Sequence, residues 1–428
     1  MSDRPYGFET LCLHAGQQPD PATGARASPI YQTAAYVFDD TDHAASLFNL
    51  QTFGNIYTRL MNPTTAMFEE RMAALEGGRA AVATSTGMAA QMVALLTILK
   101  QGDELVSANT LYGGTVTQFG VTFKRMGIKA VLVDPDDPDN FARAITDKTR
   151  AVYGETVGNP NNNVLDIEAV ADIARDAGVP LVIDNTFASP YLCRPMEFGA
   201  DIVVHSATKF ICGHGTSMGG VVVESGKFPW DNGLHPDMTA PSEGYHGVRF
   251  YETFGDFAFT MKARCETLRT LGPALSPFNA FMMLQGLETL PVRMDRHVEN
   301  ARALSEFLKN HDAVTWVRYA GDPDNPYYDL GRKYLPKGAG SILTFGIKGG
   351  QRAGAKFIES ANFLSHLANV GDAKTLIIHP ASTTHRQLSE AELRQAGVSP
   401  DMIRISVGIE TIDDILWDID RALAASGC

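Results

Sequence analysis

The sequence predicts an α/β protein whose core is a mostly parallel β-sheet flanked by helices. Short apolar runs rich in β-branched residues recur between residues 80 and 225, as is typical of strands buried on both faces. Helical stretches, such as residues 87–100 and 167–178, alternate with these runs. The expected strands cover residues 80–84, 103–108, 129–134, 149–155, 179–184, 201–206 and 219–225.

Two other regions flank this α/β domain, which we expect to span residues 61–285. Residues 1–60 are polar, rich in Gly and Pro and weakly periodic, so we interpret them as an extended arm that packs on a neighbouring subunit. Helical periodicity dominates after residue 280, and strand-like pieces follow it. Residues 286–428 are therefore expected to form a second, smaller α+β domain.

An insertion interrupts the alternating pattern at about residues 225–260. It is rich in aromatic residues, Gly and Pro. Long segments of this kind in compact domains are either plain surface loops or functional elements. The sequence leaves three interpretations open: an insertion loop, a lid over the site, or a contact between subunits.

Composition limits the possible partners. The chain has 428 residues, and its 49 acidic side chains outnumber the 36 basic ones, which leaves a net charge of −13. Phosphate-rich surfaces require a basic face, so neither a nucleic acid nor an anionic membrane is the expected partner. Five scattered cysteines form no C-x-x-C pair, and the first residues show no apolar leader, so a reducing cytoplasm is expected.

Candidate site residues stand at the strand ends, because ligands of such sheets bind beyond the carboxyl ends of the strands. These residues are Gly87 and Met88 at a helix start, Tyr112 beside two glycines, Glu155 and Asn159, Asp184, and Lys209. Free backbone N–H groups and the helix dipole make a helix start suited to phosphate. Each residue alone also has an ordinary explanation, such as a helix cap for Asp184 or a solvated side chain for Lys209.

Taken together, these residues match the needs of pyridoxal 5′-phosphate. That cofactor requires a lysine that bonds to it, an acid that keeps its ring nitrogen protonated, and donors for its phosphate. Lys209 follows an apolar strand, where burial lowers the pKa of an amine and makes it a nucleophile or base. The hydroxyls of Ser206 and Thr208 are expected to face the phosphate.

Signals for other cofactors are weak. No G-x-G-x-x-G follows an expected strand and no phosphate-binding G-x-x-x-x-G-K-[ST] occurs, which disfavours a nicotinamide oxidoreductase or an ATP site. His379 and His385 suggest a metal at first sight, but they lack helical spacing and a neighbouring carboxylate. We interpret them as packing or hydrogen-bonding residues and expect no metal.

The motifs resemble the Cys/Met-metabolism family of pyridoxal-phosphate enzymes, the γ-family of fold type I. The similar segments, in family order and spacing, are TLCLHAGQQPD, PIYQTAAYVF, YTRLMNPTT, STGMAA, YGGT, ETVGNP, VIDNTFASPY, HSATKF, GHG, HPASTTH and IRISVGIE. This resemblance covers nearly the whole chain. It implies the fold-type-I transferase architecture, a PLP cofactor and a homotetramer built from two catalytic dimers.

The resemblance also implies a role for each matched residue at the cofactor. Lys209 matches the lysine that bonds to the cofactor, and Asp184 matches the partner of its ring nitrogen. Tyr112 matches the tyrosine that stacks on the ring and assists proton transfers. Asn159 is expected near the 3′-oxygen. The implied phosphate ligands are the Gly87 and Met88 amides and the Ser206 and Thr208 hydroxyls.

Further residues resemble contacts to the substrate and to a second subunit. Tyr57 and Arg59 match a pair that reaches the phosphate from the adjacent subunit, and Tyr57 is also expected near the substrate. Arg404 matches the arginine that binds the substrate α-carboxylate, a task suited to guanidinium. Asn369 is an expected substrate contact, although the cystathionine branch usually has Ser there, so contacts from that branch do not transfer to it.

Three features resemble the homocysteine-forming sulfhydrylase branch: the chain length, the MTAPSEGYHG segment of the insertion, and Asn369-Val370-Gly371. This branch joins O-acetyl-L-homoserine with sulfide to give L-homocysteine and acetate. Cystathionine γ-synthase and methionine γ-lyase activities remain alternatives. The acyl group, acetyl or succinyl, and the acceptor, sulfide or methanethiol, stay open. A non-catalytic binding protein on the same fold would be expected to lack Lys209 or Asp184.

Overall fold

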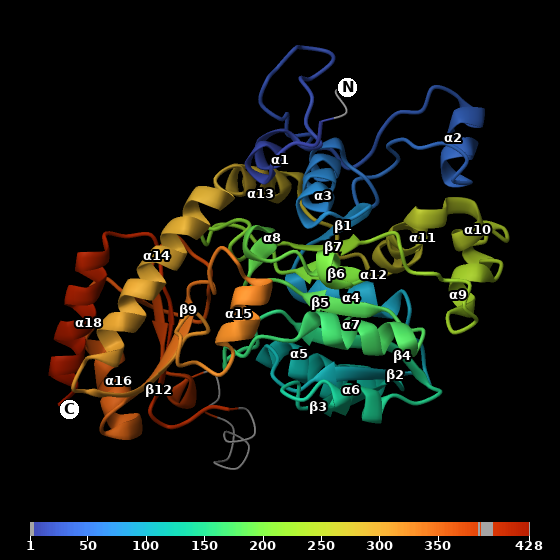
Figure 1. The fold of residues 1–428 in the computed structure, drawn as a ribbon. Coiled ribbons are helices and arrows are strands. Elements are labelled where there is room, and N and C mark those ends of the chain that lie inside the picture. Colours follow the sequence, from blue (N-terminus) through green and yellow to red (C-terminus); the bar gives the residue numbers. More distant parts are fainter. Residues whose placement is uncertain (1–3, 384–385, 387–396, 428) are drawn as a thin grey trace.

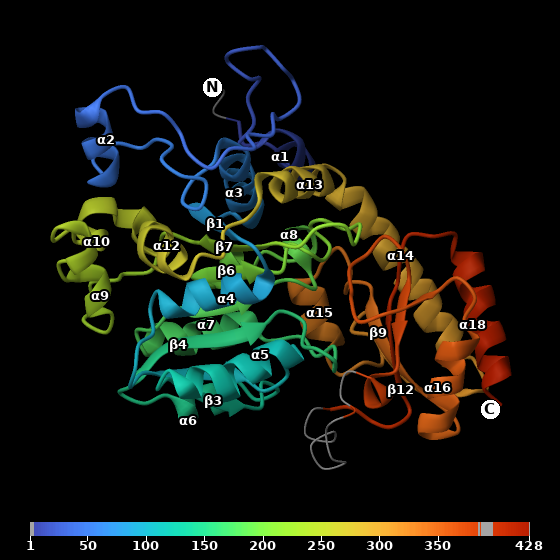
Figure 2. The same cartoon turned by 180° about the vertical axis from the view of Figure 1, so that it is seen from behind.

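Two β-sheets and the helices around them make up the chain. The computed structural model describes residues 4–383, 386 and 397–427. Figures 1 and 2 show the two sheets side by side, with the long helix α14 (Leu290–Lys309) running beside the second sheet. One continuous apolar core includes residues of both, such as Val182 and Leu343. The core therefore continues from one sheet into the other.

The larger sheet confirms the expected α/β fold. Its strands, in spatial order, are β1 (Ala80–Thr84), β7 (Gly220–Glu224), β6 (Ile202–His205), β5 (Leu181–Asp184), β4 (Thr149–Glu155), β2 (Glu104–Ala108) and β3 (Lys129–Val133). The pairs from β6 to β3 are parallel, while β7 runs antiparallel to both β1 and β6. Each strand coincides with an apolar run expected from the sequence. The carboxyl ends of β2, β4, β5 and β6 consequently meet at one edge.

Helices cover this sheet and continue into the insertion. They are α1 (Phe8–His14), α2 (Thr41–Phe48), α3 (Pro63–Glu76), α4 (Gly87–Leu96), α5 (Gly113–Thr117), α6 (Asp139–Ala144), α7 (Ile167–Asp176), α8 (Ser189–Leu192), α9 (Pro236–Thr239), α10 (Phe250–Phe254), α11 (Ala258–Lys262) and α12 (Arg269–Leu271). Short 3-10 or π turns are η1 (Gln118–Phe123), η2 (Pro195–Phe198), η3 (Glu243–Tyr245), η4 (Gly255–Phe257), η5 (Ala263–Leu268) and η6 (Pro380–Ser382). Side-chain caps set several helix starts, including Asn62 before α3 and Asp166 before α7.

The smaller sheet lies in the C-terminal part of the chain. Its strands, in spatial order, are β10 (Ser365–His366), β11 (Leu376–Ile378), β12 (Met402–Ser406), β9 (Ile342–Ile347) and β8 (Val314–Arg318). The accompanying helices are α13 (Pro277–Glu288), α14, α15 (Tyr328–Tyr334), α16 (Gly350–Ser360) and α18 (Ile412–Ser426). The helical stretch expected after residue 280 is broken at Thr289, and α14 starts at Leu290. Pro291 lies in the first turn of α14, where a missing backbone N–H is tolerated, but it could not continue α13.

The N-terminal arm extends away from the sheets. Figure 1 shows its blue trace at the top of the molecule, with α2 above α10. Backbone contacts between residues 33–36 and 56–58 fold the arm back on itself. Val37 and Phe53 on this arm are 97% and 83% exposed, although both are apolar. Apolar side chains exposed to this degree on one segment indicate a surface that packs against something else.

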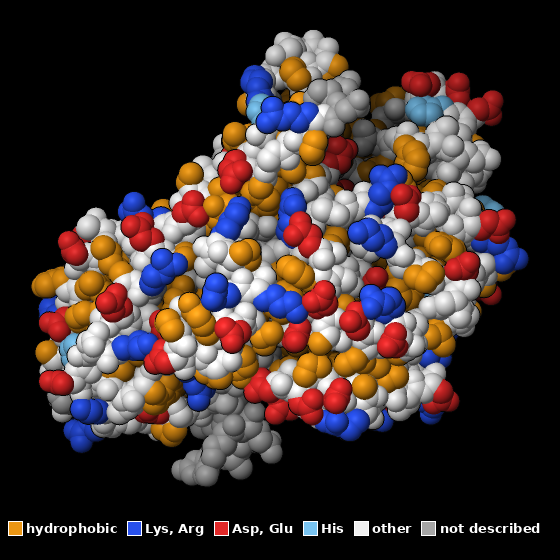
Figure 3. Space-filling view, viewed as in Figure 1, with side chains coloured by type: hydrophobic (Ala, Val, Ile, Leu, Met, Phe, Trp, Pro, Cys, Tyr) orange, Lys and Arg blue, Asp and Glu red, His pale blue; other side chains and the backbone are white. Residues whose placement is uncertain are grey.

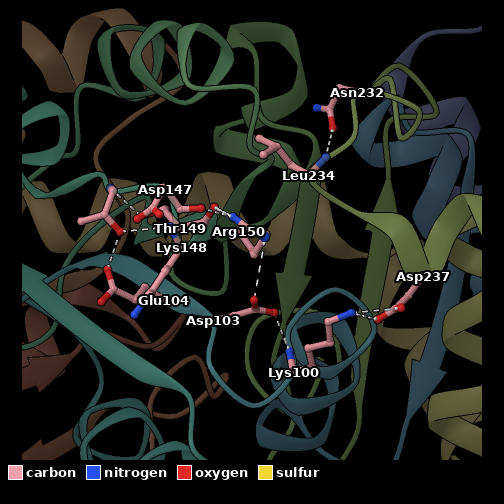
Figure 4. Close-up of polar contacts among 11 residues, drawn as sticks. Lys100, Asp103, Glu104, Asp147, Lys148, Thr149, Arg150, Asn232, Leu234 and Asp237 are labelled. Carbon is pink, nitrogen blue, oxygen red and sulfur yellow. Dashed lines mark hydrogen bonds and ion pairs between the residues drawn. The ribbon is translucent and has the colours of Figure 1, made fainter.

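The insertion is anchored at the amino ends of the strands, opposite the edge that carries the predicted site. Asp237 accepts hydrogen bonds from Lys100, at 3.0 Å to the nearer carboxylate oxygen, as Figure 4 shows. The Asn232 amide donates to the Gly178 carbonyl at 2.7 Å. Arg150 and Asp103 lie beside these contacts (Figure 4). This part of the insertion is not placed over the site of its own chain, so a role between subunits stays a prediction.

The surface carries charges of both signs. On the face shown in Figure 3, basic and acidic side chains are interspersed rather than gathered by sign. Within the described residues, no helix combines the length and apolar composition needed to cross a membrane. Cys12, Cys193, Cys212 and Cys265 are buried and free, and Cys428 lies outside the described residues.

Glu224, the last residue of β7, is a buried carboxyl far from bulk water. It accepts a hydrogen bond from the Thr260 N–H at 2.9 Å. Burial, with Asp256 as an additional negative charge, raises the pKa of Glu224 from 4.5 to about 7. A carboxyl whose pKa is higher in the folded state stabilises the fold at low pH, and this contribution is lost as the pH rises through about 7.

We expect Glu224→Gln to be increasingly more stable than wild type as the pH rises from 5 to 8. Over this pH range, the difference in free energy of unfolding between variant and wild type should change by about 3 kcal/mol. Each unit by which folding raises the pKa of Glu224 corresponds to about 1.4 kcal/mol. Urea unfolding of both proteins at several pH values measures it. The exposed Glu359→Gln is the control, and an equal pH trend in both variants would contradict the prediction.

Candidate active site

A cavity of about 250 Å³ lies at the carboxyl edge of the larger sheet. The predicted residues that line it are Gly87, Met88, Tyr112, Asn159, Asp184, Ser206, Thr208, Lys209, Asn369 and Arg404. Most of them come from the larger sheet. Asn369 and Arg404 come from the C-terminal part, and Arg404 lies on β12. The cavity therefore joins both parts of the chain.

The start of α4 provides backbone donors on one side of the cavity. Thr86 caps the helix, and its hydroxyl accepts the Ala89 N–H at 3.0 Å. The first N–H groups of a helix have no partner within the helix, which leaves those of Gly87 and Met88 for a ligand. A Cβ on Gly87 would lie 2.5 Å from the Ser206 Cβ, so only glycine lets the two backbones approach this closely.

Two hydroxyl residues face this helix start from the segment after β6. Ser206 is held by its N–H, which donates to the Thr186 hydroxyl at 2.8 Å. The Thr208 hydroxyl donates to the Gly219 carbonyl at 3.2 Å and accepts the Gly219 N–H at 3.1 Å. Thr208 is thus already engaged with the glycine-rich segment, and its hydroxyl would have to turn to reach a phosphate.

Two carboxyl groups lie side by side at the ends of β4 and β5, where Glu155 is buried and Asp184 is half-buried at the cavity wall. Glu155 and Asp184 are paired residues in the parallel register of these strands. Burial raises the pKa of Asp184, although the hydrogen bond that it accepts from Thr186 opposes this effect. Burial also raises the pKa of Glu155 well above its ordinary value, and the Asp184 charge adds to this. A cation placed beside Asp184 would offset the free-energy cost of desolvating Asp184 and would reduce the repulsion between the two carboxylates.

Tyr112 lies at the open side of the cavity. Its backbone N–H donates to the Glu155 carboxyl at 2.6 Å, which fixes the start of the tyrosine loop against β4. The Tyr112 side chain is 51% exposed, and the nearby lining residue Met218 is 61% exposed. The cavity is therefore open to solvent at these two residues, and a flat ligand could stack against the tyrosine ring.

Lys209 carries an amine suited to nucleophilic chemistry. Burial lowers its pKa from 10.5 to about 8, and the positive charge of Arg404 contributes to this lowering. The Lys209 ammonium donates a hydrogen bond to the side-chain oxygen of Asn369. A substantial fraction of this amine is consequently neutral near pH 8, as a nucleophile or base requires.

Arg404 reaches the cavity from β12. Its guanidinium donates to the Asn159 side-chain oxygen at 3.2 Å, and burial lowers its pKa to about 10. The group stays positively charged at neutral pH. A half-buried guanidinium whose side-chain partner is a neutral amide is well suited to a carboxylate ligand.

Tyr57 and Arg59 do not line the cavity of their own chain. They lie on the arm, where the Arg59 guanidinium carbon is 5.6 Å from the centre of the Tyr57 ring. Their position agrees with a role toward another subunit, which stays a prediction.

Several lining residues were not selected from the sequence. These are Thr86, Gln91, Thr115, Val157, Thr186, Phe187, Met218, Ala368 and Val370, and Glu155 was noted without a role. Thr186 and Phe187 directly follow Asp184, so proximity in sequence was an available signal. Gln91 lies one turn after Gly87 on α4, where its oxygen accepts from Thr115 at 3.1 Å. For Ala368 and Val370 the sequence offered only their proximity to Asn369.

His379 is a buried hydrogen-bonding residue, as expected. Its Nε2–H donates to the Pro400 carbonyl at 2.9 Å, and its other ring nitrogen is 2.8 Å from the Ser382 hydroxyl. His385 lies outside the described residues.

Comparison with known proteins identifies the family. The family model described as Cys/Met metabolism PLP-dependent enzyme matches residues 9–424. The chain belongs to this family. A crystal structure from Campylobacter jejuni, described as a candidate O-acetylhomoserine (thiol)-lyase, has a TM-score of 0.95 and 38% identity and covers 98% of this chain and 100% of its own. That structure carries N′-pyridoxyl-lysine-5′-monophosphate.

Curated members of the family are similar over almost their whole length. An O-acetyl-L-homoserine sulfhydrylase from Leptospira meyeri is 55% identical, covering 98% of this chain and 97% of its own. A homocysteine synthase from Schizosaccharomyces pombe is 53% identical, with 97% and 98% covered. An O-acetyl-L-homoserine sulfhydrylase from Thermus thermophilus is 51% identical, with 97% and 100% covered.

The residues of the cavity fit the cofactor of this family, pyridoxal phosphate. The N-terminus of α4 offers unpaired N–H groups beside Ser206, as a phosphate requires. Among the described residues, the groups that most affect the pKa of half-buried Asp184 include no lysine or arginine, which suits a protonated ring nitrogen there. Lys209 supplies an amine whose pKa is already lowered. The enzyme is therefore PLP-dependent, and these residues are the proposed ligands.

We expect covalent capture of pyridoxal phosphate by the cofactor-free enzyme to accelerate as the pH rises through about 8, because Lys209 then loses its proton. Arg404→Ala should move this midpoint to higher pH, since one positive charge is removed. Arg404→Lys keeps the charge and serves as the control. Borohydride reduction followed by mass spectrometry measures the captured fraction. An unchanged midpoint in Arg404→Ala would show that the charge of Arg404 does not act on Lys209.

Proposed function

We propose that this enzyme catalyses a γ-replacement in which O-acetyl-L-homoserine and sulfide give L-homocysteine and acetate. The observation that carries this proposal is the joining of Lys209, Asp184 and Arg404 in one cavity. It places an amine, a buried acid and a carboxylate-binding cation around one small ligand. The curated relatives at 51–55% identity, named sulfhydrylases and homocysteine synthase, support the same reaction.

The residues divide the work between binding and proton transfer. Pyridoxal phosphate, when bound, withdraws electrons from the α-carbon of an amino acid. Arg404 binds the α-carboxylate of the substrate in place of its present partner Asn159, and a bidentate contact fixes the orientation of the amino acid. The Asp184 carboxylate would hold a positive ring nitrogen at a position of low solvent access, where the ion pair is less screened than in water.

Lys209 moves the protons. Once its amine is free, its lowered pKa allows it to remove a proton from the substrate α-carbon and to return it later. Asn369 accepts a hydrogen bond from this amine and so keeps it within the cavity. Tyr112, anchored through Glu155, would stack on the cofactor ring and assist proton transfer at the β-carbon of the substrate. Acetate then leaves from the γ-carbon, where sulfide adds.

The alternatives differ in the second reactant. A cystathionine γ-synthase must accept cysteine, and a methionine γ-lyase acts on methionine alone. The relatives that share about half of the sequence favour a sulfhydrylase, and their names favour the acetyl donor over the succinyl donor. Product analysis with acetylated or succinylated homoserine and sulfide, then cysteine, then methionine alone, separates these activities.

The assembly is part of the proposal. We propose a cytoplasmic homotetramer of two catalytic dimers in which the arm of one subunit carries Tyr57 and Arg59 to the phosphate of the next. The exposure of Val37 and Phe53 supports packing of the arm on a second copy. The domain limits 1–60, 61–285 and 286–428 are also part of the proposal, and the positions of the arm and the two sheets support them.

We expect Lys209→Ala to lose covalently held cofactor and to lower kcat/KM for homocysteine formation by about 10²–10⁴-fold, the usual contribution of one acid–base group. Absorbance of the bound cofactor and a coupled assay for acetate measure the two effects. Lys227→Ala, an exposed lysine, is the control. Retention of both the absorbance and the activity would refute the role of Lys209.

We expect Lys209→Ala and Arg59→Ala subunits to complement each other. In a mixed dimer, one of the two sites would have Lys209 from one chain and Arg59 from the other. Random mixing should therefore restore about a quarter of the wild-type activity, because half of the dimers are mixed and each has one intact site. Activity of the two proteins before and after unfolding and joint refolding is the measurement. No recovery, with mixed dimers confirmed by mass spectrometry, would place Arg59 outside the neighbouring site.

A further inference from the structure

Three neighbouring cavities share lining residues, and the active-site cavity is one of them. A large surface cavity of about 810 Å³, here the outer hollow, lies between α14 and the segment 319–339. A small cavity of about 10 Å³, here the neck, is lined by residues 157, 187–188, 335 and 339–342.

The neck shares a wall with each of its neighbours. Val157 and Phe187 line both the neck and the active-site cavity. Leu335 and Ala339 line both the neck and the outer hollow. These four residues therefore lie between the neck and its two larger neighbours. A route for a small molecule from the outer hollow to the active site would pass Leu335 and Ala339 first, and then Val157 and Phe187.

The neck accepts only small, uncharged molecules. Its volume is close to that needed to hold one water. Its lining contains no charged side chain. The Ser341 hydroxyl is fully buried and has no hydrogen-bond partner among the described residues, so it offers one polar contact to a molecule inside. Gly340, at φ +82°, brings the chain close to the Phe187 carbonyl without a side chain in the way.

The second reactant needs its own entrance, because the amino-acid substrate enters and occupies the open side of the active-site cavity. That side is marked by the exposed Tyr112 and Met218. A bound amino acid whose carboxylate contacts Arg404 fills much of a 250 Å³ cavity. The second reactant then has to reach the γ-carbon by another route. Neutral hydrogen sulfide is larger than water but smaller than any organic thiol, and it carries no charge to desolvate.

We propose that the neck is the access path for hydrogen sulfide and that its width selects sulfide over larger thiols. Phe187, Leu335 and Ser341 are among the side chains that line the neck and limit its width. This inference rests on the proposed function, because it assigns the route of the second substrate of that reaction. It makes Ser341 and Leu335 specificity-determining residues outside the contacts to cofactor and amino acid.

The test narrows the neck with Ser341→Val, which replaces the hydroxyl and adds a methyl group. We expect kcat/KM for sulfide to fall about tenfold, as for one methyl group in a tight passage. The rate at which O-acetylhomoserine alone changes the absorbance of the bound cofactor should stay at the wild-type value, since the amino acid enters by the open side. Ser341→Ala is the matched control: it also removes the hydroxyl but leaves the neck open, and it should keep most of the sulfide efficiency.

Leu335→Ala widens the neck and tests the same idea in the opposite direction. The preference for sulfide over ethanethiol, as a ratio of kcat/KM values, should fall by about tenfold. Cofactor absorbance and circular dichroism establish that each variant is folded. If Ser341→Val does not fold, Ala339→Val at the outer end of the neck takes its place.

The outcomes separate the two proposals. A wild-type enzyme that forms no homocysteine from O-acetylhomoserine and sulfide overturns the proposed function, and the sulfide path with it. The wild-type enzyme can also be active while Ser341→Val and Leu335→Ala keep its sulfide kinetics and thiol preference. That result overturns the sulfide path through the neck and leaves the proposed function intact. A loss of efficiency for sulfide in Ser341→Val but not in Ser341→Ala, with unchanged reaction toward the amino acid alone, supports it.

Discussion

A pair of adjacent acids at the wall of the cavity is the constraint on which the rest of this site depends. Asp184 ends a strand that lies inside the protein, and desolvation raises its pKa. Beside it, Glu155 is buried, so two acids lie next to each other in a region of low solvent access. Such an arrangement is costly unless a positive group is bound. A protonated pyridine nitrogen beside Asp184 would meet that need.

The surrounding residues follow from this requirement. If Asp184 holds the cofactor ring, the same cavity edge offers the start of α4 for the phosphate and Lys209 for the aldehyde. Arg404 adds a positive charge that lowers the pKa of Lys209 while it remains available for a substrate carboxylate. One guanidinium thus has an electrostatic effect on the base and a binding role toward the substrate.

The site also depends on the contact between the two sheets. Lys209 belongs to the larger sheet, whereas Asn369 and Arg404 belong to the C-terminal part, and all three meet in one cavity. The neck lies in the same junction, between residues 157 and 187–188 on one side and 335–342 on the other. A junction of this kind can hold a reactive lysine and still leave space for a small second reactant.

The sequence by itself determined the strands of the larger sheet, the helix start at Gly87, and the choice of Lys209 and Asp184. These features depend on neighbours along the chain: apolar runs, helix caps, and polar residues at strand ends. Asn369 and Arg404 were assigned by family resemblance, not by any local pattern. Only the tertiary structure decided that Glu155 anchors Tyr112, that Arg404 contacts Asn159, and that the neck shares lining residues with both the outer hollow and the site. These contacts join residues dozens to hundreds of positions apart, and packing of the whole core, rather than any local pattern, brings them together.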